Sequence, residues 1–201
     1  MNAYFPEKTG RKNAFIVDMM KRTFIRPRDY FSAIEILINY MKEQKSTNEF
    51  FSKKDVNSDY FNRKFSAYLL SEVKSYMEFY VTSSDADKYL RFFQYLNGNR
   101  QFNWNFFLKC YKQFSAYMDS EDIENRDYYK TPEKLLQFLY EANVIGYNQM
   151  SEKDNLKFYN WAFREREALE LRPQVKLGAN YEVFDGVAKA LNIGVAFKQN
   201  S

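Results

Sequence analysis

Two arginines in the stretch Arg26-Pro27-Arg28-Asp29 are the residues of this chain best suited to chemistry. A guanidinium group is planar and always charged, and its fork of N–H donors matches the oxygens of a phosphate group. In enzymes that transfer phosphoryl groups, such an arginine stabilises charge on the γ-phosphate. The same two side chains can instead pair with the carboxylate of Asp18 or Asp29 and stabilise the start of a helix. The sequence leaves both interpretations open.

The chain contains no histidine, and this absence removes several kinds of site. Ser-His-Asp and Cys-His catalysis need a histidine base, and many zinc sites need an imidazole ligand. The one cysteine, Cys110, is aligned at helical spacing with Phe106, Phe107 and Phe114, which predicts a buried structural thiol. A GxxxxGK[ST] phosphate loop is absent from the sequence as well. We therefore expect a protein that is not an enzyme and holds no cofactor.

Acidic side chains gather at Asp85 and Asp87, and again over residues 121–124. Carboxylates are common in a chain with 26 acidic residues, and neither cluster has the supporting ligands of a metal site. We expect solvated turns at both places and no metal.

A second set of residues could contact DNA or a partner protein. Arg, Lys, Asn and Gln side chains on an exposed helix read base edges in the major groove, and lysines contact phosphates. The set lies on a predicted helix and at the tip of a predicted hairpin, and consists of Lys130, Lys134, Gln137, Lys153 and Lys157. Acidic Glu141, Glu152 and Asp154 lie beside them and would repel DNA. Contact with a protein therefore stays the other interpretation.

Charge and composition limit the class of protein. Residues 1–28 carry seven basic and two acidic residues, whereas the remainder carries 23 basic and 24 acidic ones. This basic arm can contact phosphates or pack against an acidic neighbouring domain. Only 6 Gly and 4 Pro accompany 45% hydrophobic residues, which favours a mainly helical protein. We expect no membrane segment, since no run approaches the ~20 apolar residues that a spanning helix needs. The lone cysteine favours a cytoplasmic location.

Helical periodicity is clearest before residue 120. A stripe of Phe31, Ile34, Leu37, Ile38 and Met41 predicts a helix that begins near Asp29, with Pro27 at its first position. Ser52 or Asp55 could cap a short turn, and Ser58 or Asp59 the next long helix. The predicted helices cover about 14–20, 29–45, 59–80, 89–96 and 102–118, and Asn97-Gly98 ends the fourth of them.

The pattern changes after the charged connector 120–127. Thr131 and Pro132 predict the start of a helix that runs through Glu141, followed by a strand from about residue 143. A second β-like run, 156–163, predicts an antiparallel hairpin, and a short strand from Tyr181 leads to a helix over 187–191. We therefore predict a mainly α (α+β) fold, with a helical lid-like bundle over 1–120 and a winged-helix-like subdomain with a small β-hairpin over 128–201.

Three segments resemble the C-terminal region of bacterial P-loop ATPases of the FunZ-like kind, which are common in mobile elements and defence islands. They are RPRDYFSAIEILIN at 26–39, KFSAYLLSEVKSYM at 64–77 and LLQFLYEANVIGY at 135–147. The resemblance covers roughly residues 15–195 and implies a helical lid followed by a winged helix. The nucleotide-binding core of the family is missing, and YEVFDG stands where members often have a histidine. ATPase activity is therefore not implied.

The resemblance implies a nucleotide-sensing function for Arg26 and Arg28, beside a nucleotide that another domain would hold. We expect the rear part of a larger ATPase or a free-standing relative, which acts as a non-catalytic regulatory or interaction module. Its partner would be a P-loop ATPase core, another protein or a second copy of the chain. The alternative is a protein that binds double-stranded DNA through the winged helix and the basic N-terminal arm.

Overall fold

The fold was examined in a computed structural model, which describes residues 19–48, 50–151, 156–167 and 173–194. It is 56% helical and contains a small four-stranded antiparallel sheet, so the predicted mainly α (α+β) class is confirmed. In these ranges no helix has both the length and the apolar character needed to cross a membrane. Lys153 and most of the predicted first helix lie outside the described residues.

The helices and strands follow one another along the chain. In order they are α2 (Pro27–Glu43), α3 (Lys53–Val56), α4 (Asp59–Met77), α5 (Ser83–Leu90), the 3-10 helix η2 (Arg91–Leu96), β1 (Gln101–Asn103), α6 (Trp104–Ser120), α7 (Pro132–Glu141), β2 (Ile145–Met150), β3 (Lys157–Asn160), α8 (Ala162–Glu167), β4 (Asn180–Val183) and α9 (Asp185–Ala188).

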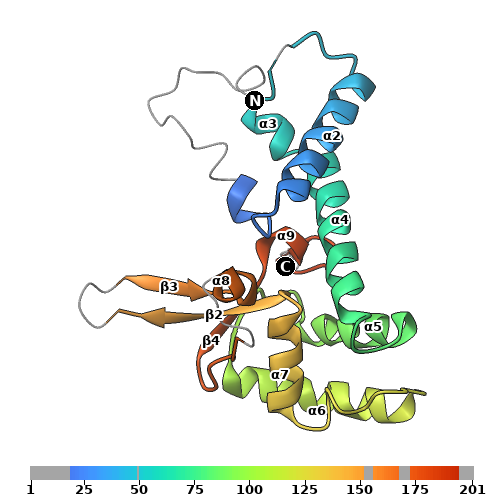
Figure 1. The fold of residues 1–201 in the computed structure, drawn as a ribbon, viewed down its shortest axis with the longest axis vertical. Coiled ribbons are helices and arrows are strands. Elements are labelled where there is room, and N and C mark those ends of the chain that lie inside the picture. The colour runs from blue at the N-terminus through green and yellow to red at the C-terminus, as the bar shows by residue number, and fades with distance from the viewer. Residues whose placement is uncertain (1–18, 49, 152–155, 168–172, 195–201) are drawn as a thin grey trace, which may run out of the picture.

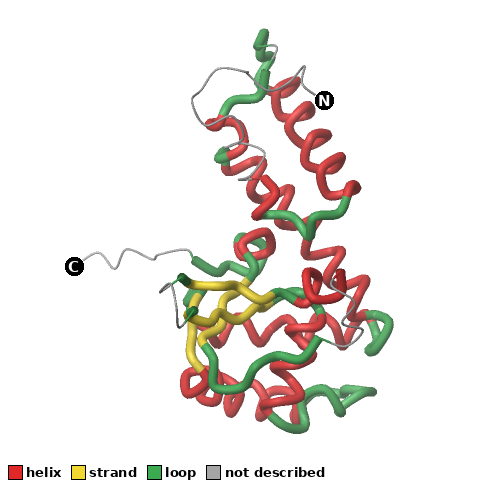
Figure 2. Tube along the Cα trace, turned by 60° about the vertical axis from the view of Figure 1, so that its left-hand side comes forward, coloured by secondary structure: helices red, strands yellow, loops and turns green. Residues whose placement is uncertain are grey.

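Helix α4 connects the two ends of an elongated molecule. Its first half lies beside α2 and α3 in the upper arm, and its last turns reach α5 in the lower body (Figure 1). The strands gather on one side of that body, with helices below and beside them (Figure 2). Residues of the arm, the body and the sheet belong to one hydrophobic core cluster, so α4 is packed along its whole length. Both predicted ranges, 1–120 and 128–201, contribute to that core.

The starts of several helices were predicted correctly from their capping residues. The Ser52 side chain and the Asp55 carboxylate form a reciprocal capping box, and Ser58 accepts a hydrogen bond from the backbone N–H of Phe61. Thr131 caps α7 in the same way, with Pro132 at the first helical position. These contacts confirm the predicted caps, because each of them depends only on residues within four positions of one another.

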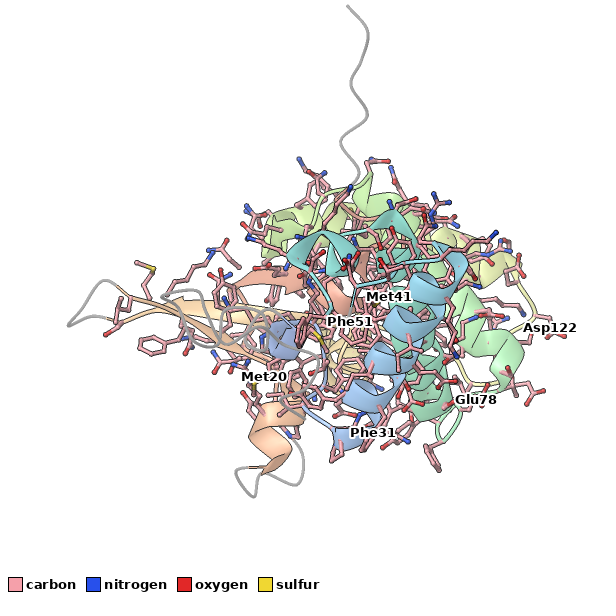
Figure 3. The ribbon with its side chains drawn as sticks, turned by 90° about the horizontal axis from the view of Figure 1, so that it is seen from above. Met20, Phe31, Met41, Phe51, Glu78 and Asp122 are labelled. Carbon is pink, nitrogen blue, oxygen red and sulfur yellow. The ribbon has the colours of Figure 1, made fainter. Side chains whose placement is uncertain are left out.

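The predicted stripe of α2 was wrong at Phe31. That side chain is 66% exposed and lies at the margin of the molecule, whereas Phe51 lies nearer its centre (Figure 3). The buried face runs instead through Asp29, Ala33 and Leu37, one residue every four. The rotation of α2 is therefore set by the buried carboxylate of Asp29 and not by the bulk of Phe31.

Strand β1 was not predicted. It lies immediately before α6 in the sequence and forms part of the sheet. The helix expected over 102–118 begins instead at Trp104, because the Asn103 side chain accepts from the N–H of Phe106 and caps it. Residues 101–103 are left extended and pair with β4, with Phe102 opposite Tyr181. The strand order is β1-β4-β2-β3, so β4 returns to the centre after the chain has formed β3 and α8.

The β-like run 156–163 was predicted too long. Strand β3 ends at Asn160, and the carbonyl of Trp161 accepts from the N–H groups of Arg164 and Glu165 as α8 begins. The Trp161 ring is buried edge-on against Phe184, 5.2 Å between centroids, and lies over Gly146. This anchoring of Trp161 turns the chain away from the sheet and ends the strand.

The short helix α9 meets α4 at a place without room for a side chain. A Cβ atom on Gly186 would lie 2.3 Å from the carbonyl oxygen of Arg22 and 2.5 Å from the side chain of Leu69. The close approach lets the Asp185 carboxylate pair with Arg22, from the N-terminal part of the chain, and with Arg100, from its middle. Gly186 thereby joins the N-terminal turn, α4 and the sheet.

We expect Gly186→Ala to lower the free energy of unfolding by about 3 kcal/mol, since overpacking against a backbone oxygen forces the elements apart. The matched variant Gly178→Ala has open space around its Cβ but a positive φ of 73°. It should cost roughly 1 kcal/mol through backbone conformation alone. Urea unfolding followed by circular dichroism measures both. Equal losses in the two variants would contradict the packing explanation.

Candidate functional site

The Arg-Pro-Arg-Asp stretch lies in a sharp turn that leads into α2. Ile25, just before it, has a φ of 59°, which is strained for a β-branched residue. The Thr23 hydroxyl accepts from the N–H of Ile25 and donates to the carbonyl of Met20, which holds the turn from its N-terminal side. Pro27 then occupies the first turn of α2 with Arg26 in an extended conformation. The local sequence therefore fixes the backbone positions of both arginines.

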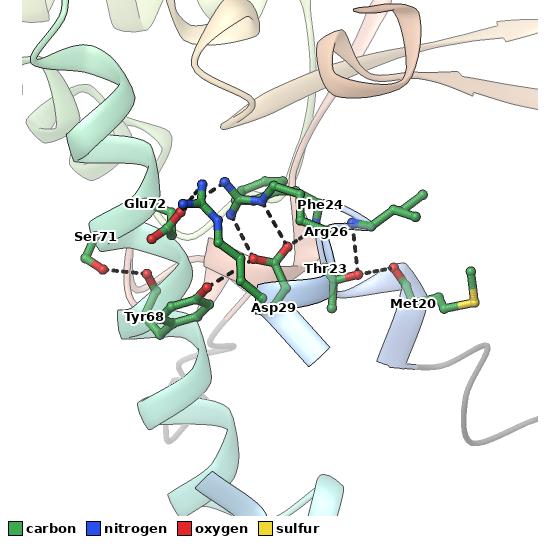
Figure 4. Close-up of polar contacts among 10 residues, drawn as sticks. Met20, Thr23, Phe24, Arg26, Asp29, Tyr68, Ser71 and Glu72 are labelled. Carbon is green, nitrogen blue, oxygen red and sulfur yellow. Dashed lines mark hydrogen bonds and ion pairs between the residues drawn. The ribbon is translucent and has the colours of Figure 1, made fainter. Parts of the chain in front are cut away.

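The centre of this turn is the carboxylate of Asp29, which is fully buried. It accepts the backbone N–H of Phe24 at 2.9 Å, the Arg26 Nη2 at 2.8 Å and the hydroxyl of Tyr68 at 3.2 Å (Figure 4). A buried charge costs several kcal/mol unless it is paired and hydrogen-bonded, and here both oxygens of Asp29 are satisfied. The carboxylate joins the turn to α4.

Glu72 of α4 completes the cluster from the other side. Its carboxylate lies 3.0 Å from Nη1 of Arg26 and 2.6 Å from Nη2 of Arg28. The two arginines and the two acids therefore cancel in charge, and the Arg26 guanidinium also lies 5.0 Å over the ring of Phe24. The pairing of Arg26 with Asp29 is the stabilising contact that the sequence offered as an alternative. The partner Glu72 was not expected, because it lies more than 40 positions along the chain.

The hydroxyl of Tyr68 stays protonated in this cluster. Burial raises its pKa, and the carboxylates of Asp29 and Glu72 add to the increase. A protonated hydroxyl is the form that can donate a hydrogen bond to Asp29. Its arrangement stabilises the start of α2, and the nucleotide-sensing function of Arg26 and Arg28 stays a prediction.

The candidate contact residues of α7 are only partly available. Lys130 pairs with Asp127 at 2.5 Å and holds the pKa of that carboxyl below its ordinary value, while Lys134 is exposed. Gln137 is used internally: its amide donates to the carbonyl of Pro173 and accepts the N–H of Val175, both at 2.9 Å. Residues 173–175 thus cover part of the helix face that was predicted to meet DNA or a partner.

Lys157 lies apart from the α7 residues. It is exposed on β3, in the hairpin that projects to the side of the body (Figure 1), whereas Lys130 precedes α7 and Lys134 lies in the first turn of that helix. Its ammonium lies 5.2 Å over the ring of Tyr159. The structure therefore does not gather the predicted contact lysines on one helix face, and Lys153 lies outside the described residues.

The same hairpin also exposes apolar side chains that were not predicted as contact residues. Met150 is 58% exposed, Leu156 57% and Phe158 52%, and all three lie at or beside the outer end of β2 and β3. The β-like run 156–163 predicted a hairpin, but Met150, Leu156 and Phe158 were not among the predicted contact residues. By the strand register Met150 lies on the same face as Lys157 and Phe158 on the opposite face, so the hairpin exposes apolar side chains on both of its faces.

Two of the hollows on the described surface involve charged or predicted contact residues. One, of about 460 Å³, is lined by Arg63, Lys74 and Lys189 among others, but these cations pair with Asp59 and Asp87. The other, of about 800 Å³, is a groove between the end of α4, the connector 125–128, α7 and residues 173–177. Sequence analysis missed the groove, because its walls come from four separate segments and no local spacing relates them.

The remaining candidates are structural. Cys110 is buried, its thiol donates to the carbonyl of Tyr95, and burial raises its pKa, so the predicted structural thiol is confirmed. Asp85 was predicted as a solvated turn and this was wrong: it is buried and accepts the N–H of Glu124, which fastens the connector to α5. Within the described ranges, no three His, Cys, Asp or Glu side chains are placed to hold a metal ion together.

Comparisons of the chain with models of protein families, with curated proteins and with solved structures found no match. The candidate surfaces are therefore argued from their own geometry.

We expect Asp29→Ala to lower the free energy of unfolding by about 3–5 kcal/mol, because it leaves the half-buried Arg26 and the N–H of Phe24 without their acceptor. The control is Asp87→Ala, which removes an exposed ion pair with Lys74 and should cost less than about 1 kcal/mol. Urea unfolding measures the two losses. Similar small losses in both would show that the Asp29 cluster does not hold the turn.

Proposed function

We propose that the chain is a non-catalytic module that binds another protein, and that the β2–β3 hairpin makes the contact. The observation that supports this most directly is the exposure of Met150, Leu156 and Phe158 on a hairpin that projects from the body (Figure 1), with Met150 and Phe158 on opposite faces of the hairpin. Each of these side chains is about half exposed, so a partner that covered it would recover on the order of 1 kcal/mol.

The outer edge of β3 adds a second means of contact. Among the described strands, β3 pairs with β2 alone and forms one edge of the sheet. An edge strand presents backbone donors and acceptors that another extended chain can pair with, and neighbouring side chains supply selectivity. Phe158 and Tyr159 would flank such an added strand on opposite faces, because side chains alternate along β3.

The resemblance to P-loop ATPases supplies the partner that we propose first, a nucleotide-binding core. In that setting Arg28 is the better candidate for nucleotide sensing, since its side chain is 62% exposed and is held by Glu72 alone among the described carboxylates. Arg26 is more firmly held, by both Asp29 and Glu72. Contact with a γ-phosphate would require Arg28 to exchange one carboxylate for a phosphate oxygen, and the two are similar ligands for a guanidinium fork.

The second candidate function is DNA binding by a winged helix, and the order of elements favours it. Helix α5, strand β1, helices α6 and α7, strand β2 and strand β4 follow one another, with β1-β4-β2 adjacent in the sheet. This is the order of a winged helix in which β3 and α8 are inserted before the last strand. Against it, Gln137 is committed to residues 173–175, and Glu133 and Glu141 lie on the helix that would enter the groove.

The hairpin can be tested by placing a photo-crosslinking benzoylphenylalanine at Phe158 in cells, with Phe79 as the matched position. Phe79 is also exposed but lies after α4. We expect an adduct with one defined protein from position 158 only, and direct binding of that purified protein to the chain. Phe158→Lys should weaken the binding at least about tenfold, the effect of losing one buried aromatic anchor. Equal adducts from both positions would contradict the proposal.

Binding of a labelled random DNA duplex separates the two candidates. We expect flat fluorescence anisotropy at near-physiological salt. Strong binding that falls steeply with salt would instead promote the winged-helix function, because counterion release makes phosphate contacts salt-dependent. In that case charge reversal at Lys130, Lys134 and Lys157 should weaken binding, and reversal at Lys42 on α2 serves as the control.

A further inference from the structure

Strand β3 presents a regular set of backbone groups at the outer edge of the sheet. The N–H of Ser151 donates to the carbonyl of Leu156 across the hairpin, and such bonds recur at every second residue of an antiparallel pair. Phe158 therefore bonds to β2, whereas the N–H and C=O groups of Lys157 and Tyr159 point away from it. Among the described strands, none other than β2 pairs with β3.

The side chains of β3 are open to solvent as well. Lys157, Phe158 and Tyr159 are exposed and Asn160 is half-buried, so no described segment covers the strand. Lys157 and Tyr159 share one face, where the ammonium lies 5.2 Å over the ring, and Phe158 lies on the other. The hairpin projects from the described body (Figure 1), so another folded chain can approach this edge.

We propose that β3 pairs antiparallel with β3 of a second copy of the chain, about a two-fold axis that passes at Phe158 perpendicular to the sheet. The two four-stranded sheets then form one continuous sheet. This inference rests on the proposed function, because it names a second copy as a partner of the same hairpin.

The register follows from the outward-facing backbone groups and from charge. An axis at Phe158 places Lys157 of each copy opposite Tyr159 of the other, so these residues exchange backbone hydrogen bonds in both directions. An axis at Lys157 sets two ammonium groups opposite each other, and like charges there are destabilising. An axis at Tyr159 places Lys157 beyond the end of the other strand. The axis at Phe158 brings each lysine to a tyrosine ring, the kind of contact that Lys157 already makes within its own chain.

A second copy suits this edge better than a flexible peptide does. Its β3 is already extended and held by β2, so pairing requires little ordering, whereas a free peptide loses conformational freedom when it is fixed as a strand. At the axis, Phe158 of one copy lies directly opposite Phe158 of the other, and this is a non-hydrogen-bonded pair, in which the side chains are closest. Aromatic cross-strand pairs at such positions are stabilising.

Cysteine cross-linking of the full chain tests the register. In Phe158→Cys the two Cα atoms lie about 4.5 Å apart across the axis, within the range of a disulfide. Tyr159→Cys and Lys157→Cys are the matched controls, since each faces its own copy only diagonally, at about 7–8 Å. In a glutathione buffer we expect a covalent dimer from Phe158→Cys and at least about tenfold less from the controls. Cys110 is buried and is kept. Equal yields from the three variants would overturn the register.

Sedimentation velocity of the unmodified chain tests the dimer itself. We expect a reversible monomer–dimer equilibrium with a Kd of ~100 µM, as befits a small interface. Tyr159→Pro removes an N–H that points away from β2, so the hairpin keeps its own bonds while the dimer weakens at least about tenfold. Circular dichroism checks that this variant is folded, and Phe79→Lys, at an exposed residue after α4, should leave the Kd unchanged. A chain that stays monomeric to about 1 mM would overturn the proposal.

The failures of the two proposals are distinguishable. If the photo-crosslinker at position 158 captures a different protein and the chain stays monomeric, the dimer is wrong and the protein-contact function stands. If Phe158→Cys joins two copies and the photo-crosslinker captures only the chain itself, the dimer stands and the hairpin has no other partner.

Discussion

The buried carboxylate of Asp29 is the constraint on which the arrangement of the upper arm depends. A fully buried charge must find partners, and those of Asp29 come from the turn before α2 and from α4. Satisfying them fixes the rotation of α2, forces Ile25 into a left-handed conformation and leaves Phe31 in solvent. The strain at Ile25, on the order of 1–3 kcal/mol, is sustained because so many contacts define the turn.

Helix α4 transmits this constraint to the rest of the molecule. Glu72 receives both arginines of the turn, Leu69 one helical turn earlier packs where Gly186 leaves room, and Tyr76 one turn later begins the wall of the groove. Ala190, just after α9, donates its N–H to the Ser66 hydroxyl of the same helix. Contacts with α4 therefore position the start of α2, the end of the sheet and the groove.

How much of this the sequence could predict depends on the range of each interaction. The caps at Ser58 and Thr131, the first-turn Pro27 and the buried Cys110 follow from neighbours within one or two turns, and they were predicted correctly. Strand β1 exists only because β4 lies beside it, and Trp161 ends β3 only because Gly146 and Phe184 receive its ring. Such tertiary partners override local propensity, and one sequence does not indicate them.

The candidate sites also differ in whether their residues can be recognised from local sequence or only from the fold. Residue type made Arg26 and Arg28 the predicted candidates for contact with a phosphate, but type alone could not show that the Glu72 carboxylate pairs with both of them. The lysines of the hairpin were predicted as contact residues from their charge, whereas the apolar Phe158 beside Lys157 is a candidate because it is exposed, and only the fold determines exposure. The groove is the extreme case, since Tyr80, Tyr128, Gln137 and Val175 have no relation until the chain is folded.

The pairing of charges bears on the kind of partner that the molecule can recognise. Arg22, Arg26, Arg63, Lys74 and Arg100 each lie within ion-pair distance of an acid in the described chain, which leaves little net field from these cations at long range. A DNA-binding surface draws most of its affinity from unneutralised cations. A protein-contact surface needs shape, apolar area and a few fixed polar groups. The hairpin supplies exposed apolar area, and this is the observation behind our proposal that the chain binds another protein.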